Sequence, residues 1–428
     1  MKKIVKILCI ILCLCACASM LISCRPKTLA TYGKNKISVN VYEFLLSRAK
    51  GTLAYYGYDV TSSTFWQTVI SLEDGKTFDE YYCEEIKRQT IHYLIADKRF
   101  DDLGLTLSES DEKLIDDFLA GLVQSAGSKS NLNAELQEFG VNYDILREIY
   151  IIEAKIERLK EHLYGANGEK ISLEEKEKYF NENYVGFKQI FVATYDYVID
   201  TDRFGDTVYY TDDKHTAIAY DTVNGATVTN EYGKVVKDIL GNPEYLTADG
   251  KVAYDKENGV IGYLINEDGD KVIESVSADK KAEIYDTVKK YASKCNGDVD
   301  LFEEYIDLYD ESESSSIVYL VSERGYYAAQ NDYVAYLDDM AAKAAGLEIG
   351  ECAVFESEYG YHVICRYGNE KGAYDVKDNA DMFADFYDSL ILYLFDSYCA
   401  KYENEVKIKE KVFAKAPTMV DVGVNTLY

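Results

Sequence analysis

Residues 347–364 read LEIGECAVFESEYGYHVI, and this stretch decides the fold of the second half of the chain. Apolar residues recur on both sides of Glu358, which predicts two strands joined by a turn over residues 351–366. The second strand carries His362. A single histidine on an apolar strand is more often a hydrogen-bonded core residue than a catalyst, so its role depends on its neighbours in the fold.

The segments upstream of this stretch predict further elements. Ser172-Leu173-Glu174-Glu175 is a capping box that predicts a helix over 173–183. Alternating residues over 187–194 predict a buried strand, and helical periodicity marks 278–292, 301–308 and 332–346. Residues 196–274 differ in composition and predict hairpins, because short Tyr- and Val-rich runs alternate with the turn signals Asn224-Gly225, Asp249-Gly250, Asn258-Gly259 and Asp268-Gly269.

The order of these segments resembles the parvulin-type peptidyl-prolyl isomerases. In that family an L-x-x-G-E run precedes a strand, a turn and a final Y-G-Y-H-[IV]-I strand, and residues 347–364 are similar to this signature. Residues 179–192 resemble the end of the family's opening helix and its first strand, and 282–302 resemble its first helix and the Asp-Phe step that follows. The resemblance implies a parvulin-like α+β domain.

The resemblance also implies a set of site residues. In the family, two histidines on the first and last strands face each other beneath the proline ring, beside a Cys or Asp and a Ser or Thr. The last-strand histidine corresponds to His362 and the first-strand position to Gln189. The Ser/Thr position falls on Tyr359, and Asp310 is the best match for the acidic position.

The substrate-binding part of the site follows from the same resemblance. The large apolar residue of the proline pocket corresponds to Met340, with Tyr336 one helical turn earlier. A Gly-Gly-Asp-Leu-Gly segment normally shapes this pocket, and residues 314–325 stand in its place. Isomerising an X–Pro bond makes no covalent bond, so we expect neither a metal nor a cofactor.

Residues 37–165 are almost wholly helical in pattern, with the strongest periodicity over 143–163. This region resembles the helical chaperone domain of PrsA/SurA-like extracytoplasmic foldases, a domain of the SurA N-terminal type. A helix over 379–401 carries an apolar stripe that needs a partner. We therefore expect a helical chaperone domain over 37–171, joined by the C-terminal segment 376–428, and a parvulin-like domain over 172–375 with a β-rich insertion at 196–274.

The N-terminus has the layout of a secretory signal peptide over residues 1–23, with three lysines before an apolar run. Leu21-Ile22-Ser23-Cys24 resembles a bacterial lipobox, in which the cysteine is diacylated and becomes the new N-terminus. This predicts an extracytoplasmic chain, held on the cell membrane by lipid at Cys24 and followed by a polar tether over 24–36. The alternatives are an uncleaved anchor and a plain signal peptide with an accidental cysteine.

The charge of the chain excludes some functions. The 428 residues include 75 Asp and Glu against 46 Lys and Arg, a net charge of −29 that argues against nucleic-acid binding. Cleavage after residue 23 would remove three lysines and leave a net charge of −32. Besides the lipidated cysteine, the cleaved chain would keep five cysteines: Cys83, Cys295, Cys352, Cys365 and Cys399. None of them forms a C-x-x-C pair, so the sequence predicts buried thiols rather than a disulfide framework.

Three hypotheses follow for the function. The first is a membrane-anchored foldase that isomerises X–Pro bonds in unfolded secreted proteins, supported by the 347–364 signature and the lipobox. The second is a chaperone that keeps the parvulin fold without rotamase activity, supported by Gln189 at the family's histidine position and by the missing Gly-rich segment. The third is a solute-binding or adhesive surface lipoprotein, supported by the Tyr-rich insertion.

Overall fold

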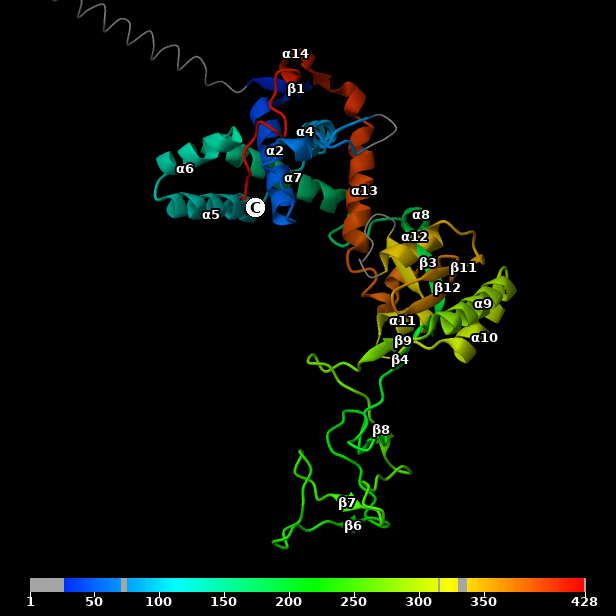
Figure 1. The fold of residues 1–428 in the computed structure, drawn as a ribbon. Coiled ribbons are helices and arrows are strands. Elements are labelled where there is room, and N and C mark those ends of the chain that lie inside the picture. Colours follow the sequence, from blue (N-terminus) through cyan, green and yellow to red (C-terminus); the bar gives the residue numbers. More distant parts are fainter. Residues whose placement is uncertain (1–26, 71–74, 315, 330–336, 427–428) are drawn as a thin grey trace, which may run out of the picture. The chain divides into compact units, whose positions relative to one another are not determined.

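The computed structural model describes residues 27–70, 75–314, 316–329 and 337–426 (Figure 1). Its contacts divide the chain into two compact units. Unit 1 contains the residues up to 176 and those from 383 onward, and unit 2 contains 177–382. The sequence placed these boundaries at 171/172 and 375/376. Helices and several small sheets occur together, so the α+β class is confirmed. The predictions for residues 1–26, including Cys24, lie outside the described residues.

Unit 1 is built on three helices that pack against one another: α2 (Val39–Tyr55), α4 (Phe78–Asp102) and α7 (Tyr143–Tyr164). Side chains cap two of them, because Thr77 and Glu80 form a capping box on α4 and Asn142 accepts a hydrogen bond from the backbone of α7. The apolar faces of the three helices share one core. Shorter helices complete the unit: α3 (Ser63–Trp66), α5 (Glu109–Ala126), α6 (Lys129–Leu136) and η1 (Gln137–Phe139).

The expected tether over 24–36 is wrong for the residues from 28 onward. They form β1 (Thr28–Tyr32) and β2 (Asn35–Ser38), in a three-stranded sheet of order β13-β1-β2. Leu29, Ala30 and Ile37 are buried in the core of unit 1. The third strand, β13 (Lys407–Ile408), comes from the far end of the chain, so the local sequence around β1 does not predict this pairing.

The C-terminal segment is an integral part of unit 1. Helix α13 (Phe386–Ala400) packs on α4 and α7, and it is followed by η4 (Glu403–Glu405) and α14 (Glu410–Phe413). Lys50 of α2 is buried, and its Nζ donates to the backbone carbonyls of Met419 and Val422, each at 2.8 Å. A buried ammonium is costly unless it is hydrogen-bonded, so these carbonyls hold the tail in place.

Unit 2 is organised around a four-stranded antiparallel sheet that follows α8 (Leu173–Asn183), within which the boundary of the units falls. The strands are β3 (Tyr184–Ala193), β10 (Tyr326–Ala329), β11 (Cys352–Glu356) and β12 (Gly360–Tyr367), in the order β10-β3-β12-β11. The register of β12 on β3 pairs His362 with Phe191 and Ile364 with Gln189. Gly360 has no room for a side chain, since a Cβ there would lie 2.3 Å from the carbonyl oxygen of Val192.

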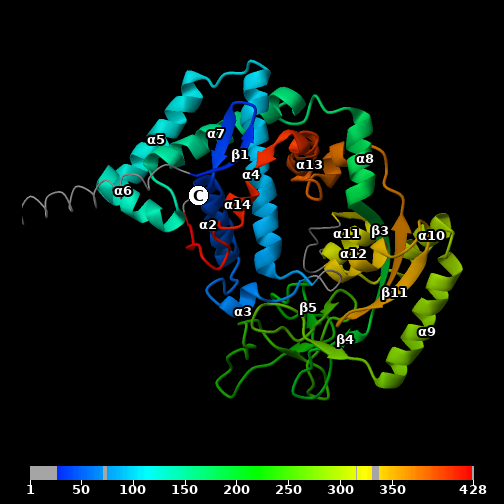
Figure 2. The ribbon, with the colours of Figure 1, turned by 90° about the horizontal axis from the view of Figure 1, so that it is seen from above.

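Each face of this sheet has its own core. The helices that cover the two faces lie on opposite sides of the sheet (Figure 2). Helices α9 (Ala278–Cys295) and α10 (Val299–Tyr309) cover one face, and α11 (Ile317–Glu323) and α12 (Asp338–Ala345) cover the other. Successive residues of a strand point to opposite faces. Val363 therefore packs with α9 and α10, while Ile364 packs with α11 and α12. The unit ends with η2 (Ala373–Asp375) and η3 (Lys377–Asn379).

The insertion consists of short strands that pair in a nested order. These are β4 (Tyr195–Tyr197) with β9 (Ile273–Ser275), β5 (Tyr209–Tyr210) with β8 (Val260–Ile261), and β6 (Ala226–Thr227) with β7 (Tyr245–Leu246). Gly250 and Gly269 lie in hairpin turns at φ of 80° and 94°, as expected. The prediction of hairpin turns is wrong for Asn224-Gly225 and Asn258-Gly259. Each of these dipeptides joins two strand segments that do not pair with each other.

The insertion is internally duplicated. The sequence Ala-Tyr-Asp-x-x-Asn-Gly occurs at 219–225 and again at 253–259, and Tyr220 pairs with Tyr254 across the two copies. The hydroxyl of Tyr220 donates to Asp238 at 3.0 Å, and the hydroxyl of Tyr254 donates to Asp202 at 3.2 Å. Asp202 lies in a hairpin turn before the first copy of the sequence, and Asp238 lies in a hairpin turn before the second copy. Each copy and the turn before it form one half of the insertion, so each tyrosine bonds to an aspartate of the other half.

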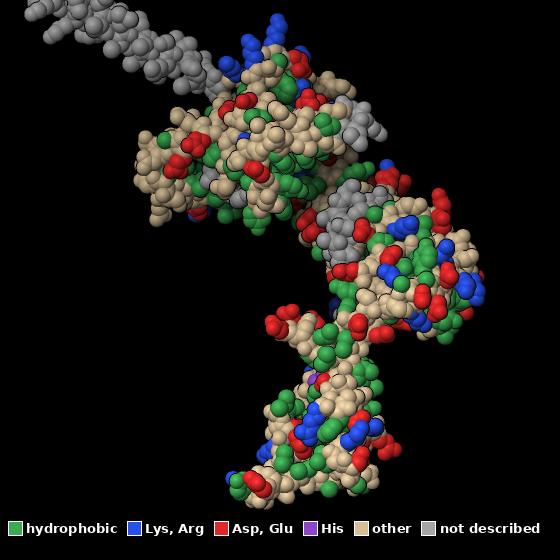
Figure 3. All heavy atoms as spheres, in the orientation of Figure 1, with side chains coloured by type: hydrophobic (Ala, Val, Ile, Leu, Met, Phe, Trp, Pro, Cys, Tyr) green, Lys and Arg blue, Asp and Glu red, His purple; other side chains and the backbone are tan. Residues whose placement is uncertain are grey.

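The backbone follows the same pseudo-twofold symmetry. The amide of Asp221 donates to the carbonyl of Ala253, and the amide of Asp255 donates to the carbonyl of Ala219. The pairing of β5 with β8 repeats that of β7 with β6. Each half supplies strands that pair with strands of the other half, so the insertion folds as one module. Many apolar side chains are exposed on its surface (Figure 3).

Replacing Tyr220 or Tyr254 with Phe tests this symmetry. Each change removes one hydrogen bond to a carboxylate, which costs about 1 kcal/mol, so the backbone amides of the insertion should exchange about fivefold faster in either variant. Hydrogen exchange of the whole chain measures this. The control is Tyr232→Phe, at a side chain of the insertion that is 78% exposed. A large effect from one tyrosine and none from the other contradicts the equivalence of the halves.

Candidate functional site

The pairing of β3 with β12 places two polar side chains together inside an apolar sheet. Gln189 and His362 lie on the same face, and His362 Nδ1 is 2.5 Å from Gln189 Oε1. Gln189 has no exposed surface and His362 is 1% exposed. The first-strand and last-strand residues identified from the sequence therefore face each other in the structure.

The amide of Gln189 has its orientation set by the backbone of α11. Its Nε2 donates to the carbonyl oxygen of Val318 at 2.7 Å, and a carbonyl can only accept a hydrogen bond. The Oε1 atom must then face His362, so His362 Nδ1 carries a proton and donates it. In the neutral ring Nε2 is left as an acceptor, and the hydroxyl of Ser357 donates to it at 2.9 Å.

The network continues from Gln189 to an acidic residue. Ser322 lies 3.3 Å from Gln189 Nε2, and its hydroxyl donates to Asp310 at 3.0 Å. Asp310 also accepts a hydrogen bond from the backbone amide of Phe191 at 2.7 Å and one from Ser312. Asp310 therefore anchors the end of the network rather than contacting His362.

Burial controls the charge of His362. Its ring packs against Phe191 and Phe355, with ring centroids 5.0 and 5.6 Å away. This loss of solvent lowers the pKa of His362 to about 4. The imidazole is neutral at physiological pH and a weak base, so it is poorly suited to activate the hydroxyl of Ser357 as a nucleophile. Neutral hydrogen-bond donors and acceptors in apolar surroundings are instead the groups that can stabilise an amide while it twists and loses its conjugation.

Two other residues proposed from the sequence, Tyr359 and Met340, form no side-chain hydrogen bond with His362 or Gln189 in the described part of the chain. Tyr359 is 40% exposed in the turn between β11 and β12, and the hydroxyl that meets His362 belongs to Ser357. Met340 is buried beneath the sheet among the residues that pack with Ile364. Tyr336 lies outside the described residues.

Sequence reasoning did not identify Ser357 and Ser322. A signal for Ser357 existed in the strand register, because Phe355 pairs with His362 and the residue two positions later enters the turn over the ring. Ser322 came from the segment 314–325 that replaces the family's Gly-rich sequence, and no local pattern points to it. That segment forms α11, which supplies both Ser322 and the carbonyl of Val318 to Gln189.

The described parts of the chain contain no cluster of three or more His, Cys, Asp or Glu side chains arranged to hold a metal ion. No helix within them is long and apolar enough to cross a membrane.

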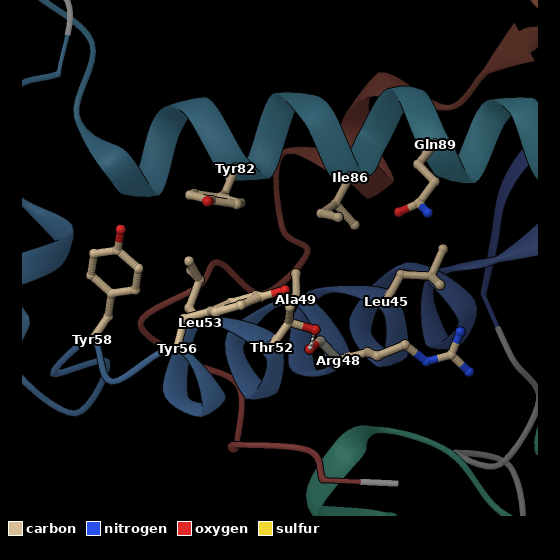
Figure 4. Close-up of a pocket in the computed structure, with 10 residues that line it drawn as sticks. All are labelled: Leu45, Arg48, Ala49, Thr52, Leu53, Tyr56, Tyr58, Tyr82, Ile86 and Gln89. Carbon is tan, nitrogen blue, oxygen red and sulfur yellow. Dashed lines mark hydrogen bonds between the residues drawn. The ribbon is translucent and has the colours of Figure 1, made fainter. Parts of the chain in front are cut away.

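A second feature with possible function is a groove of about 670 Å³ in unit 1, between α2 and α4 (Figure 4). Leu45, Leu53 and Ile86 give it an apolar lining, and Tyr56, Tyr58 and Tyr82 surround one end. Arg48 also lines the groove and forms an ion pair with Glu153 at 2.5 Å. Its buried Nε has no hydrogen-bond partner among the described residues.

Comparison with known proteins gives similarity at the level of the fold alone. No family model matches the chain, and no curated protein matches it. The solved structure of PrsA from Bacillus subtilis aligns over 82% of this chain and 94% of its own, at 16% identity and a TM-score of 0.18. The structure of the peptidylprolyl isomerase PrsA from Bacillus anthracis aligns over 74% of this chain and 95% of its own, at 11% identity and a TM-score of 0.22. The structure of the foldase PrsA from Streptococcus pneumoniae aligns over 81% of this chain and 97% of its own, at 14% identity and a TM-score of 0.21.

The depressed pKa of His362 predicts a pH dependence of stability. The unfolded chain, with a histidine pKa of about 6.5, binds this proton more readily than the folded chain, so the stabilisation is complete above pH 6.5 and is lost as the pH falls toward 4. The full loss is roughly 3 kcal/mol. Urea unfolding at pH 7 and 4.5 should show this dependence in unit 2 and a weaker one in His362→Gln. NMR titration of the His362 ring with a midpoint near 6.5 contradicts it.

Proposed function

We propose that this protein is an extracytoplasmic foldase, tethered by lipid at Cys24, that binds unfolded secreted chains and isomerises their X–Pro bonds at His362. The observation that carries this proposal is the 2.5 Å contact between His362 and Gln189 on neighbouring strands. It joins the two positions at which the parvulin resemblance requires facing polar side chains. The 347–364 signature and the lipobox support the class of protein and its location.

The chemistry of the step needs little from the protein. Rotation about the X–Pro bond breaks amide conjugation against a barrier of about 20 kcal/mol, and the nitrogen of the twisted amide becomes a hydrogen-bond acceptor. The hydroxyl of Ser357 is the part-exposed member of the network, and Gln189 positions His362 beneath it. To donate to the twisted amide, this hydroxyl must turn its single proton away from His362 Nε2. Phe355 is only partly buried beside it and offers an apolar surface to a proline ring.

A proline-limited refolding assay tests the isomerase. The wild-type protein at micromolar concentration should accelerate the slow refolding phase of a client, and His362→Ala should reduce that acceleration about tenfold or more, equivalent to at least about 1.4 kcal/mol of transition-state stabilisation. Ser357→Ala should reduce it with less disturbance of the core, and circular dichroism checks that both variants fold. Gln189→His should retain or raise the activity. No acceleration by the wild-type protein excludes the enzymatic part of the proposal.

The burial of the site favours a second candidate, a chaperone without rotamase activity. His362 is 1% exposed and lies between two phenylalanine rings, so a proline ring reaches it only if Phe355 or Ser357 moves. Every polar atom of the His362 and Gln189 side chains has a partner within the protein. Suppression of client aggregation together with no isomerisation supports this candidate over the first.

Both candidates need a surface that holds unfolded chains, and we assign this role to the groove of unit 1. Its apolar lining and its tyrosines suit an extended segment with apolar side chains.

Two neighbouring tyrosines give a matched test of the groove. Tyr56 lines it and is 71% exposed, whereas Tyr55 is 78% exposed and does not line it. Tyr56→Ala should weaken binding of a permanently unfolded, reduced and alkylated protein about fivefold, because a contact tyrosine contributes about 1 kcal/mol or more. Tyr55 packs edge-on against Tyr56, with ring centroids 5.6 Å apart, so Tyr55→Ala should weaken binding less than Tyr56→Ala does. Fluorescence anisotropy measures both affinities, and equal losses in the two variants contradict the assignment.

A further inference from the structure

The strand pair that carries His362 also carries two cysteines. Cys352 of β11 and Cys365 of β12 are direct partners in the antiparallel register. They belong to the core formed with α9 and α10, on the face of the sheet opposite to His362. Both are free thiols in the structure.

The hydrogen bonds around this pair define its geometry. The amide of Arg366 donates to the carbonyl of Glu351, so the bonds of the ladder flank Cys352 and Cys365 instead of joining them. Opposed residues at such a position lie about 4.5 Å apart at Cα, closer than those at hydrogen-bonded positions. Disulfides span Cα separations of about 4.4–6.8 Å, so the backbone already holds the two residues within bonding range.

The two side chains also share their surroundings. The thiol of Cys352 donates to the carbonyl oxygen of Gly350 and the thiol of Cys365 donates to the carbonyl oxygen of Arg366, each at 3.9 Å, and both residues pack in one cluster with Cys295 at the end of α9. Cys352 is partly exposed, whereas Cys365 and Cys295 are buried. The strand register selects Cys365 as the partner of Cys352, since these two extend from directly opposed positions on one face.

We propose that Cys352 and Cys365 form an intramolecular disulfide by exchange with a small-molecule or protein disulfide. The thiolate of Cys352 attacks the external disulfide, breaking its S–S bond and forming a mixed disulfide, and one thiol leaves with the proton that Cys352 gave up. The thiolate of Cys365 then attacks the sulfur of Cys352, and the second external thiol leaves with the proton of Cys365. The cysteine pair is oxidised by two electrons, and the external disulfide is reduced to two thiols.

The surroundings make this exchange slow at neutral pH. The neighbouring thiol of Cys365 and burial both raise the pKa of Cys352 above its usual range. The thiolate is the reacting form, so the rate should increase about tenfold for each unit of rising pH. The space outside the cell membrane, where the N-terminal sequence predicts the chain, is the compartment in which such bonds persist.

The bond would join the strands on either side of the turn that holds Ser357 against His362. Its effect on the site therefore acts through the backbone of β11 and β12, not through contact with the imidazole.

Peptide mapping of the full chain tests the proposal. The reduced protein is incubated with oxidised glutathione at pH 7, 8 and 9, alkylated, and digested with a protease that cleaves after glutamate, because Glu356 and Glu358 separate the two cysteines. We expect a cross-linked pair of peptides that contain Cys352 and Cys365, formed faster at higher pH. Cys365→Ser should lack the cross-link and accumulate a glutathione adduct on Cys352, whereas Cys295→Ser should retain the cross-link.

The map of the unsubstituted chain decides the question even where a variant folds poorly. A cross-link through Cys295, or a cross-link that forms only after the chain is unfolded in urea, overturns the proposal. So does the absence of any cross-link after prolonged exposure at pH 9. Cys399→Ser, in the core of unit 1, is the matched control and should leave the map of unit 2 unchanged.

Discussion

The antiparallel pairing of β12 with β3 is the interaction on which unit 2 depends. It joins two strands about 170 residues apart in sequence, at a register that sets Ile364 opposite Gln189 and His362 opposite Phe191. Because side chains alternate along each strand, the same register sends one set of apolar residues to α9 and α10 and the other to α11 and α12. A shift by one residue would move each side chain of β12 to the opposite face, separate His362 from Gln189 and disrupt the packing of both cores.

Glutamine at the first-strand position changes the chemistry of the pair without breaking it. A glutamine can donate from one atom and accept at another, so it satisfies His362 and the carbonyl of Val318 together. It cannot take up a proton, and the burial of His362 keeps the imidazole neutral as well. The site therefore provides fixed dipoles rather than a titrating pair, which is compatible with a reaction that transfers no proton.

Long-range contacts also complete the parts of the chain that the sequence describes least well. The buried Lys50 depends on carbonyls from the C-terminal tail, and β1 depends on β13 from the same tail. In the insertion, Tyr220 and Tyr254 each reach an aspartate of the opposite half. The repeated Ala-Tyr-Asp-x-x-Asn-Gly sequence was visible in the chain, but its reciprocal bonding was not, because turn signals describe neighbouring residues only.

The sequence by itself determined the elements whose cause is local. Side-chain caps and apolar periodicity placed α8, α9, α10 and the strands β3, β11 and β12 within a few residues, and the 347–364 signature led to His362 and Gln189. The tertiary structure decided what no local pattern contains. It assigned the hydroxyl beside His362 to Ser357 instead of Tyr359, made Asp310 the end of a hydrogen-bond network through Ser322, and turned the expected tether into a strand. These outcomes depend on strand register and on which distant groups satisfy a buried polar atom, and both are settled only when the whole chain has packed.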